Sequence, residues 1–277
     1  MFPSMKHVAI TGKTGYIASS LREYLSRYPA RYDVETLDLR NDSWKQEVFS
    51  RFDTIVLAAG LAHVRETKQN AALFDAVNRE LMVAVAAKAK ADGVRQIVFL
   101  SSMNVYGLME GVIDSETEPH PRSAYGRSKW QAEQELTAMA DNTFHVAILR
   151  PPMVYGENCK GNYQALIRLA KVLPVCPDYY NCRSMISIDR LCTHIRRVID
   201  DGSDGISLPQ DQKYGCTCDM LVEIAAKMGR RLPKSKLLNF APAILHACTK
   251  KGRKAFGDLI YVPLPCDADE EIEVQHD

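Results

Sequence analysis

The sequence has no long apolar run and almost no net charge. Of its 277 residues, 35 are Lys or Arg and 34 are Asp or Glu, which leaves a formal charge of +1. A chain without an overall field of one sign does not attract nucleic acid or acidic membrane surfaces as a whole, so we expect neither as a partner. The apolar stretches 55–62 and 81–87 are far shorter than the roughly 20 residues of a membrane helix.

The first residues lack a basic segment followed by an apolar stretch and a cleavage site, so we expect a cytoplasmic protein. All eight cysteines lie after residue 158, and none forms the C-x-x-C pair that zinc ribbons and thioredoxin motifs contain. The nearest spacings to a metal site are Cys192-Thr-His194 and Cys216-Thr-Cys218. We therefore predict reduced, mostly buried thiols and no metal site.

Short β-branched apolar runs alternate with amphipathic stretches over the first 155 residues. The predicted strands are 7–11, 32–37, 54–58, 94–101 and 143–150, and the helices between them are 19–27, 43–51, 73–91 and 123–140. This alternation is typical of an α/β fold with a doubly wound parallel sheet, the Rossmann arrangement, in which helices cover both faces. Pro151 and Pro152 end the last strand.

Beyond residue 155 the alternation fades. The pattern predicts helices near 163–171, 191–200 and 219–227, a loop over 173–183 and one strand over 184–188. We therefore predict a dinucleotide-binding Rossmann domain over 1–155 and a smaller irregular substrate-binding lobe over 156–277. That lobe ends in an acidic tail with five carboxylates between Asp267 and Glu273.

A glycine-rich turn follows the first predicted strand directly. In Thr11-Gly-Lys-Thr-Gly-Tyr-Ile-Ala18, Gly12 permits a tight turn and Gly15 lets a diphosphate approach the backbone. The helix that follows would offer its N-terminal amides to the same diphosphate. A triphosphate-binding P-loop would need glycine at position 7, where the sequence has histidine, so the spacing indicates a dinucleotide site.

A tyrosine and a lysine share one face of the helix predicted over 123–140. Tyr125 and Lys129 are four residues apart, and Ser102 lies 23 residues before Tyr125, just past a buried strand. The carboxyl ends of parallel strands are where open sheets bind ligands. The position of these three residues, rather than their spacing alone, indicates a catalytic group.

Seven segments of the first 155 residues resemble the extended short-chain dehydrogenase/reductase superfamily, in its nucleotide-sugar epimerase/dehydratase branch. They stand in the family's order at the family's spacing: TGKTGYIA at 11–18, LDLRN at 37–41, LAAG at 57–60, VN at 77–78, FLSSMNVYG at 99–107, YGRSK at 125–129 and LRPPMVYG at 149–156. In the second half only RSMISID at 183–189 is similar.

The resemblance implies a catalytic group of Ser102, Tyr125 and Lys129. Tyr125 would be the general acid and base for a sugar hydroxyl, Lys129 would bond the nicotinamide ribose, and Ser102 would bond the substrate oxygen. A nucleotide-diphosphate sugar would be the substrate, held by Ser102, Met103, Tyr125 and Arg183, the last on its diphosphate. The cofactor would contact Gly12, Lys13, Thr14, Gly15, Tyr16, Ile17, Asp38, Leu39, Arg40, Ala58, Ala59, Gly60, Asn78, Tyr125, Lys129 and Pro152.

The resemblance implies that the cofactor is NAD or NADP. Asp38 ends the second predicted strand 26 residues after Gly12, where a carboxylate would bond the adenine-ribose 2′-hydroxyl of NAD. Arg40 lies two residues after Asp38, and Lys13 lies in the glycine-rich turn. Either cation would accommodate the 2′-phosphate of NADP. We favour NAD and keep NADP as the alternative.

Chemistry at a single carbinol is the reaction that remains. Met103 and Asn104 stand where related 4,6-dehydratases carry an acidic pair, and neither can transfer a proton. Epimerisation at C3 or C5, next to a ketone, needs its own acid and base, such as a cysteine and a histidine. No cysteine stands beside Ser102, which disfavours that reaction. We predict a 4-epimerase-like enzyme, with a 4-keto sugar-nucleotide reductase as the alternative and a catalytically silent dinucleotide-binding protein as the third. A homodimer is left open.

Overall fold

The computed structural model describes residues 4–262 apart from 63, 68 and 160. Its centre is a six-stranded parallel sheet with the strand order β10-β6-β4-β3-β1-β2. The strands are β1 (Lys6–Thr11), β2 (Tyr32–Leu37), β3 (Thr54–Leu57), β4 (Gln96–Leu100), β6 (His145–Leu149) and β10 (Gly205–Ser207). The predicted doubly wound α/β fold is therefore confirmed.

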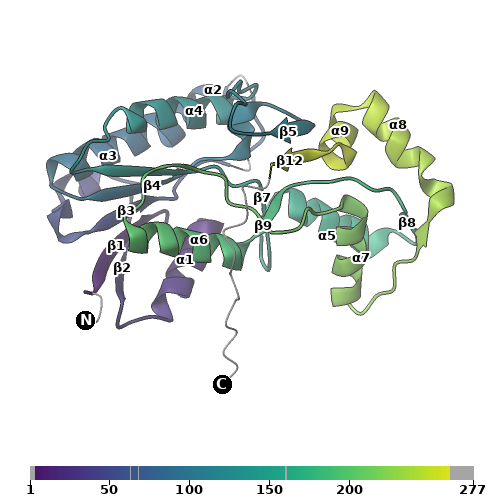
Figure 1. Cartoon of the computed structure of the whole chain (residues 1–277), viewed down its shortest axis with the longest axis horizontal. Helices are drawn as coiled ribbons and strands as arrows, with labels where there is room; N and C mark the ends of the chain where they lie inside the picture. The colour runs from purple at the N-terminus through teal and green to yellow at the C-terminus, as the bar shows by residue number, and fades with distance from the viewer. Residues whose placement is uncertain (1–3, 63, 68, 160, 263–277) are drawn as a thin grey trace.

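Helices cover both faces of this sheet (Figure 1). On one face lie α1 (Tyr16–Ser26) and α6 (Ile188–Asp201), and on the other lie α3 (Leu81–Ala91) and α4 (Ala124–Thr137). Strand residues of β3 and β4 alternate between these two layers: Ile55 and Ile97 pack on the α3 side, whereas Val56 and Val98 pack on the α1 side. Burial on both faces is why these strands read as continuous apolar runs.

Two predicted helices differ from the structure. The segment 43–51 is not an α-helix but two 3₁₀ turns, Asp42–Gln46 and Phe49–Arg51. Trp44 and Phe49 are both buried with stacked rings 6.5 Å apart, a pair that an α-helix would place on different faces. The helix predicted over 73–91 is continuous but contains α2 (Ala71–Asp75), a π-turn over Ala76–Glu80 and α3.

The second half of the chain does not fold apart from the first. Its strand β10, which the sequence pattern did not predict, joins the edge of the main sheet. Its helix α6 packs against one face of the same sheet. β12 (Leu259–Tyr261) pairs with β5 (Gly111–Ile113), and β9 (Met185–Ser187) pairs with β7 (Met153–Tyr155). The division at 155/156 stays a prediction, and the acidic tail lies outside the described residues.

The remaining elements form the smaller half on the right of Figure 1. They are α5 (Asn162–Val172), α7 (Thr217–Lys227), α8 (Phe240–Cys248), α9 (Lys250–Phe256) and the short pair β8 (Cys176–Pro177) and β11 (Lys234–Ser235). The seven described cysteines are thiols rather than disulfides, and five of them are buried, as predicted. Over the described ranges no helix has the length and apolar character to cross a membrane.

Candidate active site

The turn between β1 and α1 has the geometry of a diphosphate cradle. Gly12 has a φ of +90°, and a Cβ there would lie 3.2 Å from the Cα of Ala59. Gly15 is the N-cap of α1 and makes no side-chain cap bond, so the first-turn amides are not capped by a side chain. Such amides at the start of a full-length helix suit an anion. The residues present therefore fit the phosphates of a dinucleotide.

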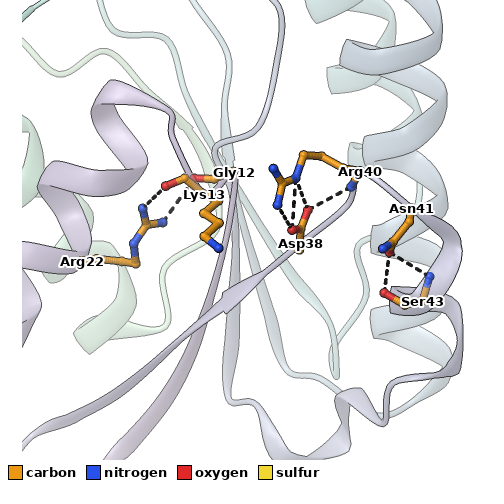
Figure 2. A network of polar contacts seen from close by, with 7 residues as sticks. All are labelled: Gly12, Lys13, Arg22, Asp38, Arg40, Asn41 and Ser43. Carbon is orange, nitrogen blue, oxygen red and sulfur yellow. Dashed lines mark hydrogen bonds and ion pairs between the residues drawn. The ribbon is translucent and has the colours of Figure 1, made fainter.

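Two arginines define the surroundings of this turn (Figure 2). Arg22 donates to the carbonyl oxygens of Gly12 and Lys13 at 3.2 and 2.6 Å, which fixes the turn from behind. On the other side Asp38, just past β2, accepts from the Nε of Arg40 at 2.9 and 3.1 Å. The Arg40 guanidinium, with a smaller effect from Lys13, holds the pKa of Asp38 well below its usual range. One carboxylate and two cations therefore lie where sequence reasoning placed the adenine ribose.

The loop after β3 is held to the turn and to α4. The Thr11 hydroxyl accepts from the amides of Ala58 and Ala59, both at 2.9 Å. Asn78, fully buried in the π-turn, accepts from the Leu61 amide at 2.8 Å and donates to the Ser128 hydroxyl at 3.2 Å. A Cβ at Gly60 would approach Asn78 Oδ1 to 2.8 Å. Asn78 thus ties the loop after β3 to the start of α4, and its predicted contact with the cofactor stays a prediction.

Ser102 and Met103 follow the end of β4. The Ser102 hydroxyl caps the turn Met103–Tyr106 by accepting from the Asn104 amide at 3.2 Å, and it also accepts from the Asn104 side chain at 2.9 Å. Both predicted residues are buried. The Met103 amide donates a hydrogen bond to the Pro151 carbonyl, and this bond brings the segment after β6, with the buried Pro152, close to Ser102. The neighbour of Ser102 is therefore an amide that orients it, not an acid.

Tyr125 and Lys129 lie on the first two turns of α4, close to Ser102. Burial raises the pKa of Tyr125, and the hydrogen bond with Ser102 opposes part of that rise. Lys129 is 4% exposed, donates to the Leu100 carbonyl at 2.8 Å and lies over the Phe99 ring. Burial lowers the pKa of its ammonium to about 7, against the opposing charge of Glu133. The three predicted catalytic residues are thus brought together at the end of β4.

The lowered pKa of Lys129 predicts a pH-dependent stability. Between pH 7 and 10.5 the unfolded chain keeps a proton on Lys129 that the folded chain has released, so raising the pH favours folding by up to about 1.4 kcal/mol per unit. Below pH 7 both states are protonated and the difference is constant. Urea unfolding of wild type and Lys129→Met should therefore show wild type gaining relative stability as pH rises above 7. A constant difference would contradict the lowered pKa.

A buried charged network behind the catalytic residues escaped the sequence reasoning. Glu133, one turn after Lys129, binds the Arg150 guanidinium at 2.6 Å and also accepts from the Ser101 hydroxyl. Glu133 and Arg150 are 1% and 4% exposed. Arg150 also donates to the Tyr106 hydroxyl at 2.8 Å. The available signal was an arginine at the end of a buried strand and an acid on the Lys129 face of α4.

Arg183 lies in the second half, just before β9. Its backbone bridges Gly215 and Leu259, and its Nη1 donates to the Gly257 carbonyl at 2.7 Å. A cavity of about 440 Å³ opens beside the same loop, but none of Ser102, Tyr125 and Arg183 lines it. Over the described ranges no cluster of three metal-ligating side chains occurs. Within the part of the chain that the structure describes, no hydrogen bond or ion pair joins Arg183 to α4, so its role stays a prediction.

Comparison with known proteins assigns the family. The model of the NAD dependent epimerase/dehydratase family matches residues 8–174. The chain belongs to this family. The match spans the whole cradle, the end of β4, α4 and the segment after β6. The resemblance seen in the sequence is thereby confirmed, and the protein is an enzyme of the short-chain dehydrogenase/reductase type.

Two curated relatives of this family are named 4-epimerases. A UDP-glucose 4-epimerase of Vibrio cholerae is 29% identical over 253 residues, covering 81% of this chain and 76% of that protein. The N-acetyl-alpha-D-glucosaminyl-diphospho-ditrans,octacis-undecaprenol 4-epimerase of Escherichia coli O157:H7 is 36% identical over 178 residues, covering 58% of this chain and 53% of that protein. The chain thus spans about three quarters of one relative and about half of the other.

A solved structure supports the fold alone. The dTDP-4-dehydrorhamnose reductase of Bacillus anthracis in complex with NADP superposes with a TM-score of 0.69 at 22% identity, covering 85% of this chain and 86% of that chain. At this identity the likeness extends to the Rossmann sheet and its covering helices, not to the reaction.

Proposed function

We propose that this family member is a 4-epimerase acting on a hexose joined to the diphosphate of a nucleotide. The observation that carries the proposal is the convergence of Ser102, Tyr125 and Lys129 at the end of β4, beside Met103 and Asn104. An acid pair beside Ser102 would support loss of water, but the residues there are a thioether and an amide. Both curated relatives described above carry the same reaction in their names.

A nicotinamide cofactor bound in the cradle would accept a hydride from the sugar carbon and return it. Tyr125 would take the proton of the 4-hydroxyl as the hydride leaves. It would return that proton after the keto-sugar has rotated and presents its other face to the cofactor. Ser102 donates to the same sugar oxygen and holds it against Tyr125. Because burial raises the pKa of Tyr125, the phenol needs positive charge nearby to act at neutral pH. Lys129 in its protonated form and a positive nicotinamide ring supply that charge.

The cofactor balance separates this proposal from its alternative. An epimerase returns the hydride in every cycle, so it must retain its cofactor, whereas a reductase exchanges cofactor at every turnover. The test is the ultraviolet spectrum of the purified protein before and after UDP-hexose. We expect retained NAD(H) and a transient absorbance near 340 nm without net cofactor consumption. Cofactor-free protein that steadily oxidises NAD(P)H with a 4-keto sugar nucleotide would establish the reductase instead, and no response to either substrate would favour a silent binding protein.

We also propose that NAD is preferred to NADP, because the Asp38 carboxylate meets the cofactor at the adenine ribose. Asp38→Ser should move the ratio of the two dissociation constants toward NADP by at least about tenfold, since it removes a negative charge and releases Arg40 toward a 2′-phosphate. Asp42→Ser, which removes the same charge from an exposed acid paired with Lys45, is the matched control. Equal shifts in the two variants would show that Asp38 does not read the ribose.

Arg183 tests the substrate side of the proposal. An arginine fork binds a diphosphate equally in the ground and transition states, so Arg183→Ala should raise KM for the nucleotide sugar by about tenfold or more and leave kcat within a fewfold. Arg231→Ala, at an exposed position in the same half, is the control and should change neither constant. Unchanged KM in the Arg183 variant would restrict that arginine to its bond with Gly257.

A further inference from the structure

The segment between Glu223 and Asp258 is strongly basic although the whole chain is nearly neutral. It contains no acidic residue and nine basic residues: Lys227, Arg230, Arg231, Lys234, Lys236, Lys250, Lys251, Arg253 and Lys254. The expectation that the chain ignores acidic membrane surfaces rests on the average charge of +1. Lys234 is paired with Asp178 and Asp219, and Arg230 bonds the carbonyls of Ala170 and Leu173. The other basic residues still create a local positive field within a Debye length, so the average does not describe this part of the surface.

An apolar helix lies in the middle of the basic segment. In α8 (FAPAILHAC), Phe240, Ile244 and Cys248 recur every four residues and therefore share one face. Phe240 is 61% exposed and Ile244 is 57% exposed, and Leu237, in the turn before the helix, is 86% exposed. Within the described part of the chain nothing covers this face. A contiguous group of large apolar side chains in water marks an interaction surface.

The opposite face of α8 is firmly anchored. Pro242 is buried there, and the His246 ring bonds the Glu110 carboxylate at 2.8 Å, across to the first half of the chain. Just before the helix, the Asn239 side chain donates to the Asp178 carbonyl at 3.0 Å. The exposed face is therefore presented by a helix docked on its other side.

The basic helix α9 packs tightly against α8. Gly252 lies so close to the preceding helix that a Cβ there would stand 1.8 Å from the Leu245 carbonyl oxygen. The two helices are in contact, and the side chains of Lys250, Lys251 and Arg253 on α9 are exposed. Lys254 lies near Arg183, and burial together with that neighbouring charge lowers the pKa of its ammonium. Among the described residues none of these four forms an ion pair with an acid. In Figure 1, α8 lies at the outer edge of the smaller half and α9 lies between α8 and β12.

We propose that the exposed face of α8 and the basic residues around it form a docking surface for an anionic lipid bilayer. Apolar side chains of this kind insert at the boundary between headgroups and acyl chains, and flanking lysines and arginines bind acidic headgroups. A second copy of this chain fits less well, because it would bring two like-charged segments together. The chain's own acidic tail complements the charge, but around its carboxylates it offers only Ile272 and Val274 to an apolar face.

The test is co-sedimentation of the full chain with vesicles of phosphatidylcholine alone or with about 30% phosphatidylglycerol. We expect binding to the anionic vesicles and at least tenfold weaker binding to the neutral ones. Lys250→Glu with Lys251→Glu should reduce the anionic partition coefficient by tenfold or more, because each basic residue near such a surface contributes about a fivefold factor. Lys45→Glu with Arg95→Glu, on the Rossmann half, makes the same change in net charge and should bind as wild type does.

The apolar contribution is tested with Ile244→Asp, which should also lower binding at least tenfold. Val48→Asp, at an exposed valine of the Rossmann half, is its matched control. Because Ile244 is far from Tyr125 in sequence and faces outward, turnover of UDP-hexose should be unchanged, and this separates failure of the docking surface from failure of the proposed reaction. Wild type that ignores anionic vesicles would overturn the proposal, as would equal loss in the control variants. So would a dimer that Ile244→Asp converts to a monomer without any vesicle binding.

Discussion

Replacing Tyr125 with phenylalanine should lower kcat by about 10²–10⁴-fold, the range that general acid–base groups contribute. The change removes the phenol hydroxyl, and with it the transferable proton and the hydrogen bond with Ser102. Its ring contact with Phe74 of α2, at 6.5 Å between centroids, is kept by phenylalanine, so α4 and α2 should stay packed together. Steady-state turnover of UDP-hexose, with NAD(H) content measured on the same preparation, is the check.

The control for this variant is Ser102→Ala. It removes the hydroxyl that orients the sugar oxygen and opposes the raised pKa of Tyr125, but it leaves the proton donor, so its loss of kcat should be smaller. A Tyr125→Phe protein with near-normal turnover and bound cofactor would show that another group moves the proton.

The sheet could be predicted because its strands carry their own signal. A strand buried on both faces is an uninterrupted apolar run, and most of β1, β3, β4 and β6 is such a run followed by a turn. The edge strand β2 is buried only in part. β10 was missed because it is a three-residue edge strand with Ile206 half exposed, so no run marks it. The predicted helix over 43–51 was wrong because its apolar residues serve a local aromatic cluster and not a helical face.

The site was predictable to the extent that it lies at strand ends. Gly12, Asp38, Gly60 and Ser102 all follow strands of one parallel sheet, whose carboxyl edge must gather them. The pairing of Asp38 with Arg40 was not predictable, since it depends on side-chain conformation. The Glu133–Arg150 pair was missed for a different reason. Sequence patterns report exposure poorly for charged residues, which are rarely buried unless they are paired.

That pair predicts the largest effect on stability. Glu133→Ala would leave the Arg150 guanidinium buried without a counter-charge, which should lower the free energy of unfolding by about 3–5 kcal/mol. Glu135→Ala, two residues along the same helix, removes an acid whose partner Arg79 is partly exposed, and should cost less than about 1 kcal/mol. Urea unfolding of the three proteins at one pH measures both values.

A double variant separates the lost pairing from lost packing. Replacing both partners, as Glu133→Met with Arg150→Met, removes the isolated charge, so it should be more stable than Glu133→Ala even though it removes more polar contacts. If the single variant does not fold, Glu133→Gln keeps the shape and hydrogen-bonding atoms while losing the charge, and should lie between it and wild type. Loss of the Glu133 charge should also lower the pKa of Lys129 further, since that charge now raises it. The free energy of unfolding of Glu133→Gln could equal that of wild type and, relative to Lys129→Met, could change with pH as that of wild type does. That result would show that the pair neither stabilises the fold nor acts on Lys129.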